Sequence, residues 1–178
     1  MSLSHALLTS LLEKSSSGYY LARRFDKSIG FFWHATHQQI YRELGRMEQA
    51  GWIESSSAPD AGKTRKRIYR VLAAGSAELL RWANQASAQM DLRDELMVRL
   101  RAEAALGTID LRSELAQRIT QHEEKLALYR TIEERDFSAL PELSRAAKIH
   151  YMILKKGILY EENSIAWSRE MLQILSIR

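Results

Sequence analysis

The sequence contains no cysteine among its 178 residues, which excludes disulfides, thiolate metal sites and cysteine nucleophiles. It also lacks a long apolar run near its start. Residues 6–12 are interrupted by Thr9 and Ser10 and have no basic leader, so neither a signal peptide nor a membrane span is expected. A chain without cysteine suits a reducing compartment. We therefore expect a cytoplasmic protein with no membrane partner.

Catalytic patterns are also scarce. The 5 histidines are scattered, and no phosphate-binding loop or nucleophile motif is present. His34 and His37 are predicted to have no carboxylate nearby. His122 and His150 could line a small-molecule cavity between the long helices, but histidines that hydrogen-bond between helices are commoner. The sequence predicts no enzymatic activity, no metal site and no cofactor.

Charge is distributed unevenly along the chain. Residues 1–85 hold 12 Lys and Arg against 7 Asp and Glu, whereas residues 86–178 hold 14 against 15. A basic half followed by a near-neutral half suggests a nucleic-acid-binding domain joined to an assembly or sensing domain.

A helix beginning at Thr36 carries the clearest functional pattern. Thr36 and Gln39 have the Thr-x-x-Gln spacing of a capping box. Ile40, Leu44 and Met47 lie on one face at about 100° per residue, which predicts a buried stripe.

The opposite face of this helix is polar. Gln38 and Arg42 carry the amide and guanidinium groups that pair with adenine and guanine edges, and a helix fits the major groove. Tyr41, at the flank, is expected to contact phosphate. An ordinary solvated face is the alternative. The predicted DNA-binding residues here are Thr36, His37, Gln38, Gln39, Tyr41, Arg42 and Arg46.

A hairpin is predicted to follow the helix. Residues 52–56 and 67–72 have strand character, and turn-forming residues 59–62 lie between them. Its tip is basic, which fits a wing that contacts phosphates or the minor groove, although a charged tip can also serve only solubility. The predicted wing contacts are Lys63, Arg65, Lys66 and Arg67.

Further helices are expected on both sides of this unit. Leu3, Leu7 and Leu11 predict a helix over residues 2–13, ended by residues 14–18, and a second helix covers residues 19–28. After the hairpin, Gly75 and Ser76 are expected to begin another helix, with Ser76 as its cap.

The second half is predicted to be helical throughout. One helix covers residues 91–105 and ends at Gly107. A near-heptad seam then runs from Leu111 to Tyr129, Pro141 permits a reversal, and a final helix covers residues 143–177.

The apolar surface of the final helix is too wide for one partner helix, so we expect a homodimer. Two winged helices related by a two-fold axis suit a pseudo-palindromic site. The residues predicted to contact the second copy are Leu3, Leu7, Ile149, Ile153, Tyr160, Trp167, Met171 and Ile174. The expected fold is mainly α (α+β): a winged helix-turn-helix domain over residues 1–86 and an antiparallel long-helix, coiled-coil dimerisation domain over residues 87–178.

Several segments resemble the PadR family of transcriptional regulators. These are residues 37–44 with Gly51, and residues 67–71 with Gly75. Residues 28–33 and 92–95, together with the length, are most similar to the AphA-like branch of virulence-gene activators. The resemblance implies a dimeric bacterial regulator in which Gln38, Tyr41, Arg42, Lys66 and Arg67 face DNA. Gly45 is unusual on such a recognition face.

The leading hypothesis is therefore a sequence-specific regulator that binds double-stranded DNA as a homodimer. The alternative is a helical protein-interaction adaptor whose basic wing docks an acidic partner. The sequence specifies no small-molecule effector and leaves one open, and it does not distinguish activation from repression.

Overall fold

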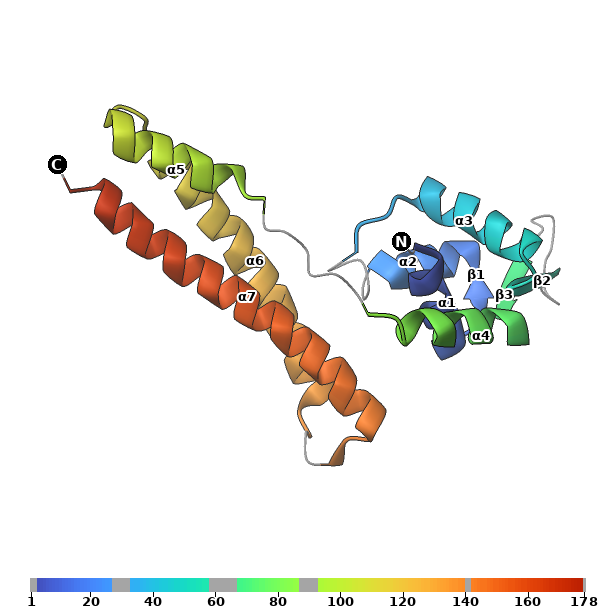
Figure 1. The fold of residues 1–178 in the computed structure, drawn as a ribbon. Helices are drawn as coiled ribbons and strands as arrows, with labels where there is room; N and C mark the ends of the chain where they lie inside the picture. Colours follow the sequence, from blue (N-terminus) through green and yellow to red (C-terminus); the bar gives the residue numbers. More distant parts are fainter. Residues whose placement is uncertain (1–2, 27–32, 58–66, 87–92, 140–141, 178) are drawn as a thin grey trace. The chain divides into compact units, whose positions relative to one another are not determined.

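The computed structural model describes residues 3–26, 33–57, 67–86, 93–139 and 142–177. The chain divides into two compact units, Met1–Met90 and Asp91–Arg178. Figure 1 shows helices packed with a small sheet in the first unit and three long helices in the second. Within the described segments, no helix has the length and apolar character needed to cross a bilayer.

The first unit has the element order of a winged helix-turn-helix. Its antiparallel sheet has the order β1-β3-β2, so β3 is central. In chain order the elements are α1 (Leu3–Glu13), β1 (Ser16–Ser17), α2 (Gly18–Asp26), α3 (His37–Gln49), β2 (Ile53–Ser57), β3 (Arg67–Val71) and α4 (Ala73–Ala83).

Strand β1 was not predicted, because residues 14–18 were interpreted only as the end of the first helix. Ser16 pairs with Tyr69 and Ser17 with Ile68 of β3. Two serines carry no strand pattern of their own. The free edge of β3 therefore decides their conformation by supplying hydrogen-bonding partners.

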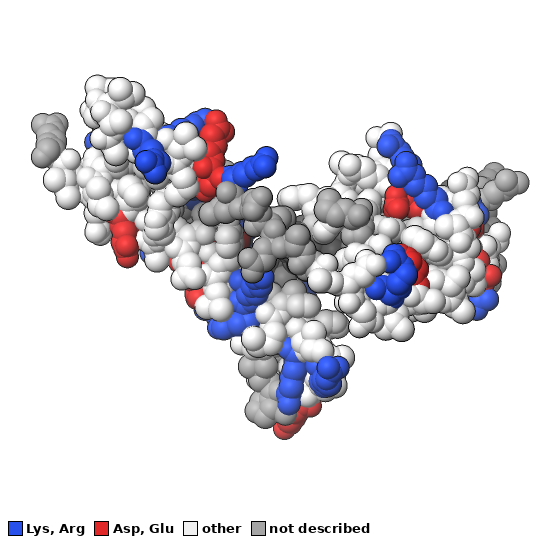
Figure 2. All heavy atoms as spheres, in the orientation of Figure 1, with Lys and Arg blue, Asp and Glu red and all other residues white. Residues whose placement is uncertain are grey.

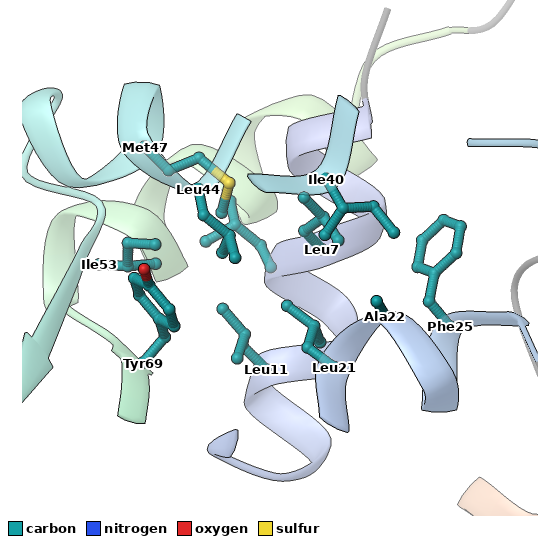
Figure 3. Close-up of a cluster of buried hydrophobic side chains, with 11 residues drawn as sticks. Leu7, Leu11, Leu21, Ala22, Phe25, Ile40, Leu44, Met47, Ile53 and Tyr69 are labelled. Carbon is teal, nitrogen blue, oxygen red and sulfur yellow. The ribbon is translucent and has the colours of Figure 1, made fainter. Parts of the chain in front are cut away.

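The core of this unit lies where the predicted apolar stripes meet. Leu7 and Leu11 of α1 pack with Leu21 of α2 and with the α3 stripe, and Tyr69 closes the cluster from β3 (Figure 3). Ile40, Leu44 and Met47 are at most 1% exposed, as their spacing predicted.

The start of α4 differs from the prediction. The helix begins at Ala73 with Leu72 as its N-cap, which makes no side-chain capping bond, so the cap expected at Ser76 is wrong. Instead, the Leu72 amide donates to the Trp52 carbonyl at 2.9 Å. A Cβ on Gly75 would lie 2.3 Å from the same carbonyl oxygen. This close approach fixes where α4 begins, and glycine permits it.

The second unit consists of α5 (Glu95–Leu106), α6 (Arg112–Phe137) and α7 (Arg145–Leu175). Gly107 ends α5 in the left-handed conformation, with φ of 65°, as predicted. Leu96, Leu111 and Leu115 form a buried cluster against the last turns of α7.

Helices α6 and α7 form an antiparallel pair. On α6, His122 bonds to Glu161 of α7, and Glu133 accepts a hydrogen bond from the Tyr151 hydroxyl of α7 at 3.1 Å. The later residue of α6 therefore contacts the earlier residue of α7, which means that the two helices run in opposite directions. A Cβ on Gly157 would lie only 3.0 Å from the Tyr129 ring. The buried residues of α7 are Ile158, Glu161, Ile165 and Ser168.

Candidate nucleic-acid interface

The orientation of α3 is fixed by its cap and by its buried face. The Thr36 hydroxyl accepts from the Gln39 amide at 3.2 Å, and the Gln39 side-chain oxygen accepts from the Thr36 amide at 2.8 Å. The predicted capping box is therefore confirmed. With three apolar residues buried on one side, the opposite side of α3 faces outward.

Gln38, Arg42, Gly45 and Gln49 occupy this outward face, and all four are exposed. Among the described residues, no hydrogen bond or ion pair engages the side chains of Gln38, Arg42 or Gln49. Figure 2 shows basic side chains projecting from the surface over α3, whose basic residues are arginines. These groups are therefore available to donate and accept hydrogen bonds outside the chain.

Other predicted residues of α3 already have partners within the chain. Thr36 and Gln39 satisfy each other in the cap, and Arg46 pairs with Glu43 at 3.4 Å. The Nε2 atom of His37 lies 3.0 Å from a carboxylate oxygen of Asp26, at the end of α2. The expectation that His37 has no nearby carboxylate is wrong, because the fold brings Asp26 beside it.

Tyr41 is 48% exposed, on the edge of α3 beside the start of α2, and Gly18 determines its position. A Cβ on Gly18 would lie 2.5 Å from the Tyr41 Cε1 atom. Glycine at the first position of α2 therefore allows the ring to pack directly against the backbone. No local sequence pattern indicates this contact, because the two residues lie on different helices.

The base of the hairpin is tied to α3 by an ion pair. Arg67 donates from Nη2 to both carboxylate oxygens of Glu48, at 2.9 and 3.0 Å, and Ser55 donates to Glu48 at 2.7 Å. The Arg67 guanidinium also lies 5.8 Å from the centre of the Tyr69 ring. Burial raises the pKa of the Tyr69 hydroxyl. Arg67 thus has a structural partner, which its sequence context did not suggest.

The remaining wing residues, Lys63, Arg65 and Lys66, lie outside the described residues. Within the described strands, Arg70 on β3 pairs with Glu54 on β2. Both arginines of β3 therefore have carboxylate partners, one on α3 and one on β2.

The predicted dimer contacts on α7 fall into an exposed set and a packed one. Ile149, Ile153, Tyr160, Trp167 and Ile174 are between 37% and 63% exposed. Met171 packs against the buried cluster of the second unit.

The two predicted contacts on α1 also differ from each other. Leu3 is only partly buried, whereas Leu7 is 0% exposed within the core of the first unit. The expectation that Leu7 contacts a second chain is therefore wrong, since it has no free surface.

A groove follows the N-terminal half of α7. It combines apolar and basic side chains, and its lining residues are Arg145, Lys148, Ile149, Met152, Ile153 and Lys156. Across the described segments, no cluster of three or more His, Asp or Glu residues is arranged to hold a metal ion.

Two family models match this chain. The model for the transcriptional regulator PadR-like family covers residues 7–81, and the virulence activator alpha C-term model covers residues 92–176. The probable transcriptional regulator Rv1176c of Mycobacterium tuberculosis is 38% identical, over 98% of each chain. The structure of the Vibrio cholerae virulence activator AphA is similar over 98% of each chain, with a TM-score of 0.81 and 29% identity.

The negative transcriptional regulator PadR of Bacillus subtilis is 27% identical, over 97% of each chain. The structure of that protein in complex with operator DNA has the same fold, with a TM-score of 0.84 over 99% of this chain and 100% of that one, at 24% identity. Its complex with p-coumaric acid has a TM-score of 0.78 and 25% identity, over 97% of this chain and 98% of that one.

Proposed function

This chain belongs to the PadR-like family of transcriptional regulators, and from that premise we propose that it binds operator DNA as a homodimer through α3 and the β2–β3 hairpin. The observation that carries the proposal is the outward face of α3. Its Gln38, Arg42 and Gln49 side chains are exposed and have no partner among the described residues. The cap and the buried stripe hold them on one rigid helix.

Each exposed group suits a distinct role at a duplex. Arg42 can donate two hydrogen bonds to the O6 and N7 atoms of guanine, and Gln38 can pair with adenine. Tyr41, held at the edge by Gly18, would donate to a phosphate. Lys63, Arg65 and Lys66 would supply sequence-independent attraction to the backbone.

His37 and Arg46 also remain in the proposed interface, although both have partners in the chain. The His37–Asp26 pair is exposed on both sides, so exchanging its carboxylate for a phosphate costs little. The Arg46 side chain is 68% exposed, which leaves it able to reach a phosphate beside Glu43. Thr36 and Gln39 act by fixing the first turn of α3. Arg67 keeps its place in the wing through Glu48.

We assign the DNA-binding domain to residues 1–86 and dimerisation to residues 87–178. The exposed apolar residues of α7, with Leu3, would form the contact between copies, and a two-fold axis would present two α3 helices to a pseudo-palindromic operator. An operator-binding regulator of this family acts in the cytoplasm and is not an enzyme.

A small-molecule effector is consistent with this architecture, since Bacillus subtilis PadR has been solved with p-coumaric acid. The groove along α7 shares Ile149 and Ile153 with the proposed dimer contact. A ligand bound there would therefore compete with the second copy for these two side chains.

The test is an in vitro selection of genomic fragments by the full-length protein, run beside Arg42→Ala. Arg101→Ala, an exposed arginine on α5, is the charge-matched control. The proposal expects a two-fold-symmetric motif that the wild type and the control recover and that Arg42→Ala loses at one position in each half-site. Recovery of unpatterned DNA by all three proteins would contradict it and favour the adaptor hypothesis.

A further inference from the structure

Gly45 lies on the outward face of α3, and no neighbour in the described part of the chain explains a glycine there. A Cβ built on it meets no atom of the described residues within 4 Å. Its φ is not positive, since Gly51 and Gly107 are the glycines with positive φ in the described residues. An alanine at this position would therefore fit without strain.

Five of the six described glycines have a local reason, and Gly45 has none. Gly51 and Gly107 adopt positive φ, with values of 69° and 65°. Gly18, Gly75 and Gly157 each lie so close to a neighbouring group that a Cβ would contact it at 3.0 Å or less.

Glycine weakens the interior of an exposed helix relative to alanine, because more backbone freedom is lost on folding. Gly45 is flanked along the outward face by Arg42 and Gln49, the exposed groups without a described partner. A side chain is thus missing on the face of α3 that would enter a major groove.

We infer that Gly45 is a specificity-determining residue: its bare backbone lets α3 approach a base-pair edge more closely than any side chain would allow. This inference rests on the proposed function, since it requires α3 to enter the groove. The close approach brings Arg42 and Gln49 within reach of adjacent bases. It also leaves room for a bulky base substituent, such as the thymine methyl group, opposite position 45.

The experiment measures thermal stability and duplex binding for the wild type, Gly45→Ala and Gly45→Leu. Binding uses a duplex recovered by selection with the wild-type protein and a scrambled duplex of the same composition. We expect Gly45→Ala to raise the melting temperature by about 2–4 °C and to weaken binding to the selected duplex by about 10-fold. Gly45→Leu should weaken that binding further, with both variants keeping wild-type affinity for the scrambled duplex.

Ser76→Ala, at an exposed position of α4, is the matched control because it also favours a helix but lies outside the proposed interface. It should be stabilised and bind as the wild type does. Equal binding of the selected duplex by Gly45→Ala and the wild type would overturn the inference while leaving the proposed function intact. A wild-type protein that does not distinguish the two duplexes would instead refute the proposed function, and the inference with it.

Discussion

Arg67 at the start of β3 donates from one nitrogen, Nη2, to both carboxylate oxygens of Glu48 near the end of α3, with N–O distances of 2.9 and 3.0 Å. The pair links the base of the hairpin to the helix that carries the proposed base contacts. The Arg67 side chain is 55% exposed, so the pair contributes only about 0–1 kcal/mol to stability. Its main effect is to fix the orientation of the hairpin.

Glu48→Gln should therefore reduce selectivity more than stability. Removing a negative charge near DNA raises affinity for any duplex, while loss of the ion pair loosens the hairpin. We expect the ratio of operator to scrambled-duplex affinity to fall by about 10-fold, with the free energy of unfolding changed by less than about 1 kcal/mol. Fluorescence anisotropy with both duplexes measures the ratio.

Glu54→Gln is the matched control for this change, because the ion pair of Glu54 joins β2 to Arg70 of β3 and not to a residue of α3. Its selectivity ratio should equal that of the wild type. An unchanged ratio in Glu48→Gln would show that the pair does not orient the hairpin.

Gly18→Ala should weaken operator binding by displacing Tyr41, since the added Cβ would lie 2.5 Å from the ring. The loss should match that of Tyr41→Ala, at about 1 kcal/mol for a phosphate contact. Because both changes remove the same contact, the double variant should lose no more than either single one. Fully additive losses would indicate that Gly18 acts independently of Tyr41.

Acid should weaken the contact between His5 of α1 and Glu78 of α4, whose side chains lie 3.0 Å apart. Hydrogen bonds from Arg81 and His5 hold the pKa of Glu78 at about 2, against 4.5 for an unperturbed glutamate. Because the pKa of Glu78 is lower in the folded state, its ionised carboxylate stabilises the fold. This contribution to the free energy of unfolding is complete above pH 4.5 and is lost as the pH falls towards 2. The free energy of unfolding, from urea titrations followed by tryptophan fluorescence, should decline over this window.

Glu78→Gln should make that decline shallower, because its amide cannot be protonated in this range. Glu170→Gln, which removes an exposed carboxylate on α7, should keep the wild-type slope. If the free energy of unfolding fell equally steeply with pH in the wild type and in Glu78→Gln, the decline would not arise from Glu78.

Glu161→Ala should destabilise the second unit strongly. Glu161 is 3% exposed and bonds to His122 across the α6–α7 contact. Removing it creates a cavity and leaves the imidazole without its partner, at a cost of about 3 kcal/mol. Replacing both Glu161 and His122 with leucine should recover most of this loss, because burying two apolar side chains carries no penalty for removing polar groups from water. Circular dichroism during urea unfolding measures both variants.

A small effect of Glu161→Ala would contradict this account of the α6–α7 contact. Glu123→Ala is the matched control, since Glu123 pairs with Arg169 across the same helices but is 46% exposed. It should cost less than about 1 kcal/mol.

Elements whose signals are local could be predicted from the residues alone. The capping box at Thr36, the buried stripe of Ile40, Leu44 and Met47, and the end of α5 at Gly107 all follow from spacings within one or two helical turns. The spacing of apolar residues along α7 likewise predicted an apolar face that is too wide for one partner helix to bury.

Contacts between elements, by contrast, depend on how the whole chain folds. Strand β1 exists because β3 offers it an edge, and α4 begins at Ala73 because Trp52 accepts from Leu72. The contacts of Gly18 with Tyr41 and of Glu48 with Arg67 join residues on different elements. No local pattern encodes such contacts, because their free energy depends on distances that arise only once the core has packed.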